Sequence, residues 1–487
     1  MSLSENCFIL KNDGTLWGCG KNDYGQLGLG DASSRNIFTK ITGDVKSAYC
    51  GSGHTLILKN DGTLWGCGRN NYGQLGLGDT TNRKTFTQIT TNADNIKSVY
   101  CGGNHTFILK NNGTLWGCGY NGVTQLGLGD VVNRTTFTQV TTNTDNIKTV
   151  YCGNNLTFIL KNDGTLWGCG ENRNSQLGLE NVNTTSIFTV IGINPGNIKS
   201  VYCGSDYTLI LQNNGTLWGC GYNDKGQLGL GDTTDRKTFT KIIDNIKLIN
   251  CGYRHTIILK NDGTLWGCGN NTFGKLGLED TTTRNIFTQI TTNIDDIKYV
   301  HCYGNNTVIL KNDGTLWGCG PNGNYQLGLG EDISNKTTFT QITINTDNIK
   351  CFANDYSNIP NIIKIYDTKV GYTETLDTNN FRNISVNKFE KIKILYTKPI
   401  DTYLNCLISF DKKQTWKTFD GLNWNIISDI SPQNIFSNGM EVSGLNSLDK
   451  NKLISGGFTG NLDFKIVMKT NNVNKTPSVT KIYIEYK

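Results

Sequence analysis

Histidine and cysteine are the side chains of this sequence best suited to metal-binding, acid–base or redox chemistry, and most of them recur at fixed spacing. The chain has 487 residues, with four histidines and sixteen cysteines. Three histidines share one slot of a repeated segment, and other copies fill that slot with leucine, tyrosine or asparagine: His54, His105 and His255 against Leu156, Tyr207 and Asn306. Because a slot that accepts leucine is a poor place for a metal ligand or a general base, we expect packing roles for these histidines.

The cysteines, like the histidines, are expected to have packing roles. Fourteen of the sixteen follow the repeat, and none stands in a Cys-x-x-Cys pair, so the usual spacing of zinc ligands is missing. A chain of this length does not need disulfides to compensate for a small core, so we expect reduced, packed thiols. The sequence predicts neither a metal nor a cofactor.

No constellation of catalytic residues stands out. There is no serine–histidine–aspartate order and no evident pair of carboxylates. The glycine-rich stretch GCGKNDYG lies between strand-like runs and precedes no helix, so it does not fit a phosphate-binding loop. These observations favour a protein that is not an enzyme.

The strongest pattern is a repeat. The segment GTLWGCG occurs seven times, and the steps between its tryptophans are 48, 51, 51, 51, 48 and 51 residues. A fixed period of this size indicates a repeat architecture. The seven tryptophans, expected to be structural residues at the interfaces between repeats, are Trp17, Trp65, Trp116, Trp167, Trp218, Trp266 and Trp317.

One unit, from His105 to Cys152, reads as four short strands. HTFILK and TLWGC flank Asn-Asn-Gly, which is typical of a tight hairpin because glycine accepts the positive φ of the turn. The runs TTFTQVT and NIKTVYC complete the unit. One small sheet cannot bury both of its faces, so the copies must stack on each other.

Seven four-stranded units can close into a ring, which predicts an all-β fold with a seven-bladed β-propeller over residues 1–351. The chain starts inside a repeat, and Thr346–Phe352 supplies the missing run, so the last strand is expected to complete the first blade. We also expect core positions such as Leu27 and Phe38. Three loop ion pairs are predicted: Asp31 with Arg35, Asp79 with Arg83, and Asp232 with Arg236.

The repeat, with YGQLGLGD at Tyr24–Asp31 and Tyr72–Asp79, resembles the regulator-of-chromosome-condensation repeat. The resemblance covers residues 1–351 and implies the same seven-bladed propeller. The nuclear member of that family is a nucleotide exchange factor that binds chromatin and uses a wedge inserted into its blades and a basic tail. Here the periods are nearly uniform and no Lys/Arg-rich tail is present, so exchange activity is kept as an alternative.

Residues 352–487 lack the repeat and contain strand-like runs, which predicts a smaller β-sandwich-like domain. The stretch LISFDKKQTWKTFDGLNWNII, Leu407–Ile427, resembles a module of tail and fibre proteins from phages of low-GC Gram-positive bacteria. The resemblance covers about 80 residues.

Variation between repeats marks candidate binding loops, because loops on a rigid scaffold commonly carry binding sites. The residues after each WGCG and YCG differ from copy to copy, and aromatic and basic residues there would decorate one end of the ring. The candidate ligand-binding residues are Arg69, Tyr120, Arg173, Tyr222, Lys225, Arg254, Phe273 and Tyr325. Solvated loops without a ligand are the alternative interpretation.

Our leading hypothesis from the sequence is a receptor-binding protein of a phage tail or cell surface. It would recognise bacterial cell-envelope glycan, or a surface protein, through the propeller loops. The alternatives are a guanine-nucleotide exchange factor or regulator of a small GTPase, and a structural hub that joins other tail or fibre proteins. Each of these three functional hypotheses is compatible with an oligomeric protein.

Charge and hydropathy set further limits. The net charge of +6 does not by itself indicate that the protein binds nucleic acid. The sequence contains no run of 18 apolar residues, so a membrane-spanning helix is not predicted. The first residues, MSLSENCFILKNDG, do not have the pattern of a secretory signal, so we expect a particle-bound or surface location reached without one.

Overall fold

A computed structural model describes residues 6–192, 198–292, 294–343 and 349–353, together with eight strands between residues 382 and 485. The chain divides into two compact units, Met1–Lys364 and Ile365–Lys487. The boundary expected after residue 351 stays a prediction, because residues 354–381 lie outside the described part.

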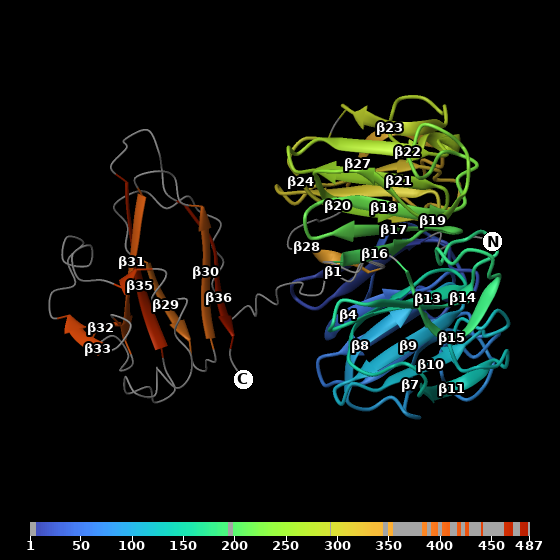
Figure 1. The fold of residues 1–487 in the computed structure, drawn as a ribbon, viewed down its shortest axis with the longest axis horizontal. Helices are drawn as coiled ribbons and strands as arrows, with labels where there is room; N and C mark the ends of the chain where they lie inside the picture. Colours follow the sequence, from blue (N-terminus) through green and yellow to red (C-terminus); the bar gives the residue numbers. More distant parts are fainter. Residues whose placement is uncertain are drawn as a thin grey trace. The chain divides into compact units, whose positions relative to one another are not determined.

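The first unit consists of seven four-stranded antiparallel sheets, the blades of a propeller (Figure 1). Their order along the chain is β28-β1-β2-β3, β4–β7, β8–β11, β12–β15, β16–β19, β20–β23 and β24–β27, here blades 1 to 7. The seven-bladed propeller predicted from the sequence is confirmed. The only helical element among the described residues is a 3-10 turn, Thr272–Gly274.

Each blade has an inner, second, third and outer strand. The inner strands are β28 (Ile349–Ala353), β4 (Val45–Cys50), β8 (Ile96–Cys101), β12 (Ile147–Cys152), β16 (Ile198–Cys203), β20 (Ile246–Cys251) and β24 (Ile297–Tyr303). The second strands are β1 (Asn6–Lys11), β5 (His54–Lys59), β9 (His105–Lys110), β13 (Leu156–Lys161), β17 (Tyr207–Gln212), β21 (His255–Lys260) and β25 (Asn306–Lys311).

The third strands carry the Leu-Trp-Gly-Cys-Gly segment. They are β2 (Leu16–Gly20), β6 (Leu64–Gly68), β10 (Leu115–Gly119), β14 (Leu166–Glu171), β18 (Leu217–Gly221), β22 (Leu265–Gly269) and β26 (Leu316–Gly320). The outer strands are β3 (Arg35–Thr42), β7 (Arg83–Ile89), β11 (Arg134–Val140), β15 (Thr184–Val190), β19 (Arg236–Ile243), β23 (Arg284–Ile290) and β27 (Lys336–Ile342).

The ring closes as the sequence predicts. Strand β28, from the end of the repeats, pairs with β1, from the beginning, with Ile9 opposite Phe352. A core cluster also joins the last blade to the first, with Val308 and Leu327 packed against Ile9 and Phe38. The first blade is therefore built from both ends of the repeat region, which leaves no open interface in the ring.

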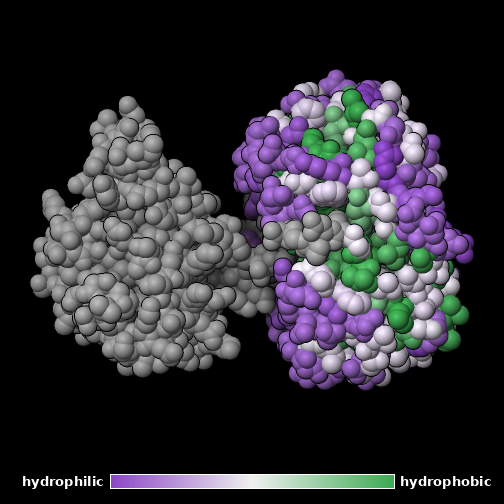
Figure 2. All heavy atoms as spheres, viewed as in Figure 1, coloured by the Kyte–Doolittle hydropathy of each residue, from purple (hydrophilic) through white to green (hydrophobic). Residues whose placement is uncertain are grey.

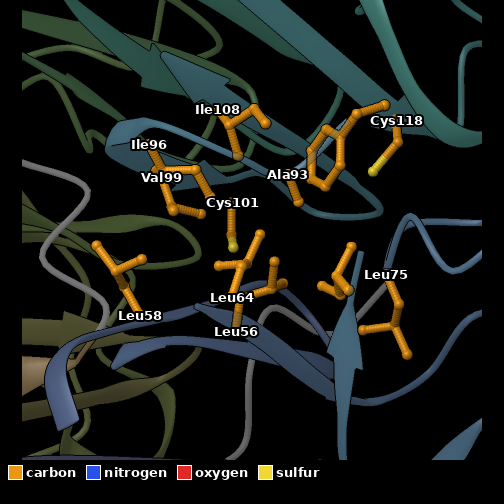
Figure 3. Packing of buried hydrophobic residues seen from close by; sticks show 12 residues of the cluster. Leu56, Leu58, Leu64, Leu75, Ala93, Ile96, Val99, Cys101, Ile108 and Cys118 are labelled. Atoms are coloured by element: carbon orange, nitrogen blue, oxygen red, sulfur yellow. The ribbon is translucent and has the colours of Figure 1, made fainter. Parts of the chain in front are cut away.

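The core lies between neighbouring blades, because each sheet buries its two faces against the sheets beside it. In the cluster of Figure 3, Leu56 and Leu75 of blade 2 meet Ile108 and Cys118 of blade 3. The glycines of the Leu-Gly-Leu segments fit this packing. Gly76 has φ +70, and a Cβ there would lie 2.8 Å from the ring of Phe137 in the next blade.

The second unit contains two groups of paired strands. Strand β31 (Thr402–Ser409) pairs with β35 (Leu462–Thr470), β32 (Trp416–Phe419) and β34 (Met440–Glu441). Three further pairings are β29 (Arg382–Val386) with β35, β33 (Trp424–Ile427) with β32, and β30 (Lys391–Thr397) with β36 (Ser478–Glu485). The predicted sandwich depends on residues outside the described part and stays a prediction. Among the described residues, no helix is long and apolar enough to cross a bilayer.

Candidate functional site

The loops that vary between repeats gather at one end of the blades, which we call the variable face. It consists of the loops after each third strand and the loops that join each inner strand to the second strand. In blade 2 these are the loops on either side of the pair His54–Gly68, where β5 begins and β6 ends. The loop after a third strand crosses to the next blade, as when the amide of Gly30 donates to the carbonyl of Lys84.

A buried asparagine holds each of these loops. Asn70 is fully buried, and its Nδ2 donates to the carbonyl and carboxylate oxygens of Asp79 at 2.9 and 3.1 Å. Its Oδ1 accepts from the amide of Leu75 at 2.9 Å. The same residue recurs in every blade, two residues after the last glycine of each Leu-Trp-Gly-Cys-Gly segment: Asn22, Asn70, Asn121, Asn172, Asn223, Asn271 and Asn322. We did not predict this role, although the invariance of the asparagine was visible in the sequence.

A second set of hydrogen bonds joins each loop to the next blade. The carbonyl of Gln74 accepts from the hydroxyl of Thr106 at 2.8 Å and from the thiol of Cys118 at 3.6 Å, both in blade 3. The Gln74 side chain accepts from the amide of Tyr72 at 3.0 Å, which fixes the tip of the loop. The scaffold thus holds the variable residues in place on both sides.

Two groups of tyrosine and arginine lie on this face. The first tyrosine–arginine cluster is centred on Arg69, whose guanidinium lies 5.2 Å from the ring of Tyr24 and 5.7 Å from that of Tyr72. The ring of Tyr120 lies 4.8 Å from that of Tyr72, tilted by 49°. The cluster spans blades 1, 2 and 3, and the Nε of Arg69 is buried without a hydrogen-bond partner among the described residues.

The second tyrosine–arginine cluster is centred on Arg254. Its guanidinium lies 4.9 Å from the ring of Tyr222 and 5.4 Å from that of Tyr253, and it pairs with Asp224 at 3.1 Å. Lys225 also reaches Asp224, at 3.2 Å. The Nε of Arg254 is buried without a partner among the described residues, as in the first cluster.

A buried lysine lies close to the second cluster. Six blades have glutamine before the Leu-Gly-Leu segment, and blade 6 has Lys275, which is 2% exposed. Its ammonium donates to Oδ1 of Asn305 at 2.5 Å. Burial, and then the neighbouring guanidinium of Arg254, lowers the pKa of this ammonium to about 8. The second cluster is therefore cationic, with Asp224 as its counter-charge.

The structure brings only some of the predicted ligand-binding residues together. Arg69 and Tyr120 share the first cluster, and Tyr222, Lys225 and Arg254 share the second. Three others stand elsewhere on the same loops: Arg173 is exposed, while Phe273 and Tyr325 have positive φ, at 72° and 59°. Tyr24, Tyr72, Tyr253 and Lys275 were not predicted. Tyr24, Tyr72 and Lys275 make their contacts with the next blade, whereas Tyr253 contacts Arg254 within one loop.

The shared histidine slot makes contacts between blades. The Nε2 of His105 lies 3.0 Å from the hydroxyl of Thr157, which donates its own hydrogen to the carbonyl of Gln125 at 2.9 Å. The imidazole must therefore donate through Nε2, and its buried Nδ1 has no partner among the described residues. Burial lowers the pKa of His105 to about 3. A neutral ring held between blades is suited to structure and poorly suited to acid–base chemistry.

The thiols are also poor candidates for chemistry. Fourteen cysteines of the described residues are free, and all except Cys203 are buried. Burial raises the pKa of each, to about 12 at Cys7 and Cys251. No group of three or more His, Cys, Asp or Glu suited to a metal occurs within the described residues.

The repeat tryptophans are half-buried and lie against the cores between blades. The indole of Trp116 packs on the cluster between blades 2 and 3, and its Nε1 donates to the hydroxyl of Thr114 at 2.9 Å. The ammonium of Lys110 lies 4.5 Å from the indole and pairs with Asp94 at 2.6 Å.

The three predicted loop ion pairs are confirmed, at 2.7 Å for Asp31–Arg35, 2.5 Å for Asp79–Arg83 and 2.6 Å for Asp232–Arg236.

Comparison with protein families finds three matches. Residues 84–355 match the RCC1-like domain, and residues 13–58 and 45–74 match the regulator of chromosome condensation (RCC1) repeat. The first match alone covers more than half of the chain.

Curated relatives include receptors and regulators. The chain is 32% identical over 249 residues to the ultraviolet-B receptor UVR8 of Arabidopsis thaliana, covering 49% of this chain and 56% of the relative. It is 33% identical over 206 residues to the human X-linked retinitis pigmentosa GTPase regulator, and this match covers 31% of this chain and 20% of the relative. It is 35% identical over 120 residues to the secretion-regulating guanine nucleotide exchange factor of Bos taurus, and this match covers 24% of this chain and 26% of the relative. The match thus spans about half of the first relative and a smaller share of the others.

Solved structures support the fold alone. Yeast RCC1 (Prp20), in a crystal structure with Kap60, has a TM-score of 0.61 at 20% identity and covers 71% of this chain and 86% of that one. Human WBSCR16 has a TM-score of 0.58 at 20% identity, covering 70% and 95%.

These relatives correct the functional hypothesis drawn from the sequence. The hypothesis of a phage-tail or surface receptor for bacterial glycan is wrong, because the relatives include a GTPase regulator and a guanine nucleotide exchange factor, which favour the alternative. Tyr120 and Tyr222, two of the predicted ligand-binding residues, pack on another tyrosine and on a guanidinium.

Proposed function

Because the chain belongs to the RCC1-like domain family, we propose that its propeller binds a small GTPase through the variable face and promotes release of the bound guanine nucleotide. The relatives named as a GTPase regulator and as a guanine nucleotide exchange factor support this proposal. The reaction breaks no covalent bond, so it needs no catalytic acid, base or metal.

The two tyrosine–arginine clusters carry the proposal. Tyrosine and arginine are enriched where proteins bind proteins, because they combine a large apolar surface with hydrogen-bonding groups. Arg69 and Arg254 are half-buried and preorganised by the tyrosine rings beside them, so each guanidinium could donate hydrogen bonds to an acidic group of a partner. The visible surface of the first unit mixes hydrophilic side chains with hydrophobic ones (Figure 2).

Nucleotide release follows from binding by linkage. A protein that binds the nucleotide-free GTPase more tightly than the GDP-bound form lowers the affinity of that GTPase for GDP by the same factor. The variable face therefore needs only to hold the GTPase in its nucleotide-free form. A rigid propeller, whose loops are fixed by Asn70 and Gln74 and their counterparts, is suited to that task.

The test is a binding titration with a fluorescently labelled small GTPase, nucleotide-free and GDP-bound. Yeast Gsp1p is the first probe, because binding to it was studied for Prp20p; a panel of other small GTPases follows. We expect at least tenfold tighter binding to a nucleotide-free member. Arg69→Ala and Arg254→Ala should each weaken binding about tenfold or more, as at interface hot spots, while the exposed Lys40→Ala on β3 should not. Equal binding of both nucleotide states across the panel would refute the proposal.

A further inference from the structure

Every inner strand of the propeller carries a lysine at its second position. These residues are Lys46, Lys97, Lys148, Lys199, Lys247, Lys298 and Lys350. The inner strands of successive blades contact one another around the axis of the ring, so their beginnings gather about that axis, at the end of the blades opposite the variable face. We call these seven residues the lysine ring.

A bulge turns each lysine of the ring away from the sheet. In blade 3, Ile96 lies opposite Lys110 and Ser98 lies opposite Leu109, so Lys97 between them has no partner on the neighbouring strand. The same shift occurs at the beginning of all seven inner strands. As a result, five of the six described side chains of the ring are exposed and Lys46 is half-buried.

The lysines of the ring are close neighbours. The ammonium of Lys199 reaches the backbone carbonyl of Lys247 in the next blade, at 3.3 Å. The inner strands also touch directly, as where the amide of Cys302 donates to the side chain of Asn250 at 3.1 Å. Lys199 and Lys247 are therefore about one lysine side chain apart, and the repeated blades give the other positions a similar arrangement.

Several of the described carboxylates at this end of the blades are bonded to groups outside the lysine ring. Asp94, Asp145 and Asp295, in the loops that lead into the inner strands, pair with lysines of the second strands at 2.6, 2.8 and 2.5 Å. The hairpin aspartates, such as Asp61, accept hydrogen bonds from the threonine two residues later. Within the described residues, no ion pair joins a carboxylate to the exposed members of the ring: Lys97, Lys148, Lys199, Lys247 and Lys298.

We propose that the lysine ring is a binding site for a compact polyphosphate, a small molecule with several phosphate groups arranged around one centre. Ammonium groups are strongly hydrated point charges that bind phosphate from many directions, and a closed ring focuses their field on the axis. A small ligand with phosphates on all sides can meet several of these groups at once. An extended nucleic acid strand would cross the ring and meet few of them.

The test is calorimetric titration of the full chain at low salt with inositol hexakisphosphate and with inorganic tripolyphosphate. The ring variant carries Lys97→Gln, Lys148→Gln and Lys199→Gln. The control variant has the same loss of charge on exposed lysines of the outer strands: Lys40→Gln, Lys84→Gln and Lys237→Gln. An exposed ion pair changes affinity by about two- to fivefold, so the ring variant should bind about 10- to 100-fold more weakly. The control should change by less than about threefold.

The outcomes separate the proposal from its rivals. Equal weakening in both variants would show attraction to net charge alone and would overturn the site. Tighter binding of a DNA duplex than of either polyphosphate, lost in the ring variant, would assign the ring to nucleic acid and overturn the proposed ligand. Because the ring and the variable face lie at opposite ends of the blades, GTPase binding should be unchanged in the ring variant, so this test stands or fails independently of the proposed function.

Discussion

Replacement of His105 by leucine should make the stability of the propeller less sensitive to acid. His105 is fully buried, and burial lowers its pKa from 6.5 to about 3. The folded state therefore keeps the ring neutral, while the unfolded chain takes up a proton below pH 6.5. The stability that depends on the neutral ring is complete above pH 6.5 and is lost as the pH falls towards 3. At pH 5 the loss is about 2 kcal/mol, from 1.5 pH units at about 1.4 kcal/mol each.

The sequence supplies the replacement, because Leu156 fills the same slot one blade later and is 2% exposed. At pH 7.5, His105→Leu loses the contact with Thr157 but removes a buried nitrogen that has no partner, so the free energy of unfolding should change by no more than about 1 kcal/mol. Between pH 7.5 and pH 5 the variant should lose about 2 kcal/mol less than the wild type.

Urea unfolding followed by tryptophan fluorescence measures this difference, since seven of the nine tryptophans belong to the repeats. The other histidines and the carboxylates are common to both proteins and cancel in the comparison. Parallel losses of stability in wild type and variant would refute the view that His105 is a buried neutral ring between blades.

Three further predictions follow from the scaffold. Asn70→Ala leaves buried groups without hydrogen bonds and should lower the free energy of unfolding by about 2–4 kcal/mol, while the exposed neighbour Asn71→Ala should change it by less than about 0.5 kcal/mol in the same urea titration. Gly76→Ala combines a positive φ with a Cβ 2.8 Å from Phe137 and should cost about 2 kcal/mol or more; an unchanged melting temperature would contradict the packing. The buried thiols should react with an aromatic disulfide reagent only after unfolding, and rapid modification of most of them in the native protein would contradict their placement.

The fold was predictable from the sequence because its signals are local and repeated. The constant spacing of the tryptophans, the Asn-Asp-Gly turns and the incomplete first repeat together determine the number of blades and the closure by β28 and β1. The pair of Asp79 and Arg83 was predictable for the same reason, since both residues lie in one loop.

The site was less predictable because its contacts cross from blade to blade. Arg69 and Tyr120 could be marked as variable loop residues, but the contacts with Tyr24 and Tyr72 depend on how far each loop reaches over its neighbour. The burial of Lys275 follows from a single substitution in a slot that otherwise holds glutamine, and the sequence does not show that this slot faces the next blade.

The most direct test of the proposed function is the release of fluorescent GDP from a small GTPase that binds the chain. Substoichiometric amounts of the full chain should accelerate release many times over. The double variant Arg69→Ala/Arg254→Ala, with an unchanged melting temperature, should lose most of this acceleration. Release at the spontaneous rate across the GTPase panel, or full activity in the folded double variant, would contradict the assignment of the variable face to nucleotide exchange.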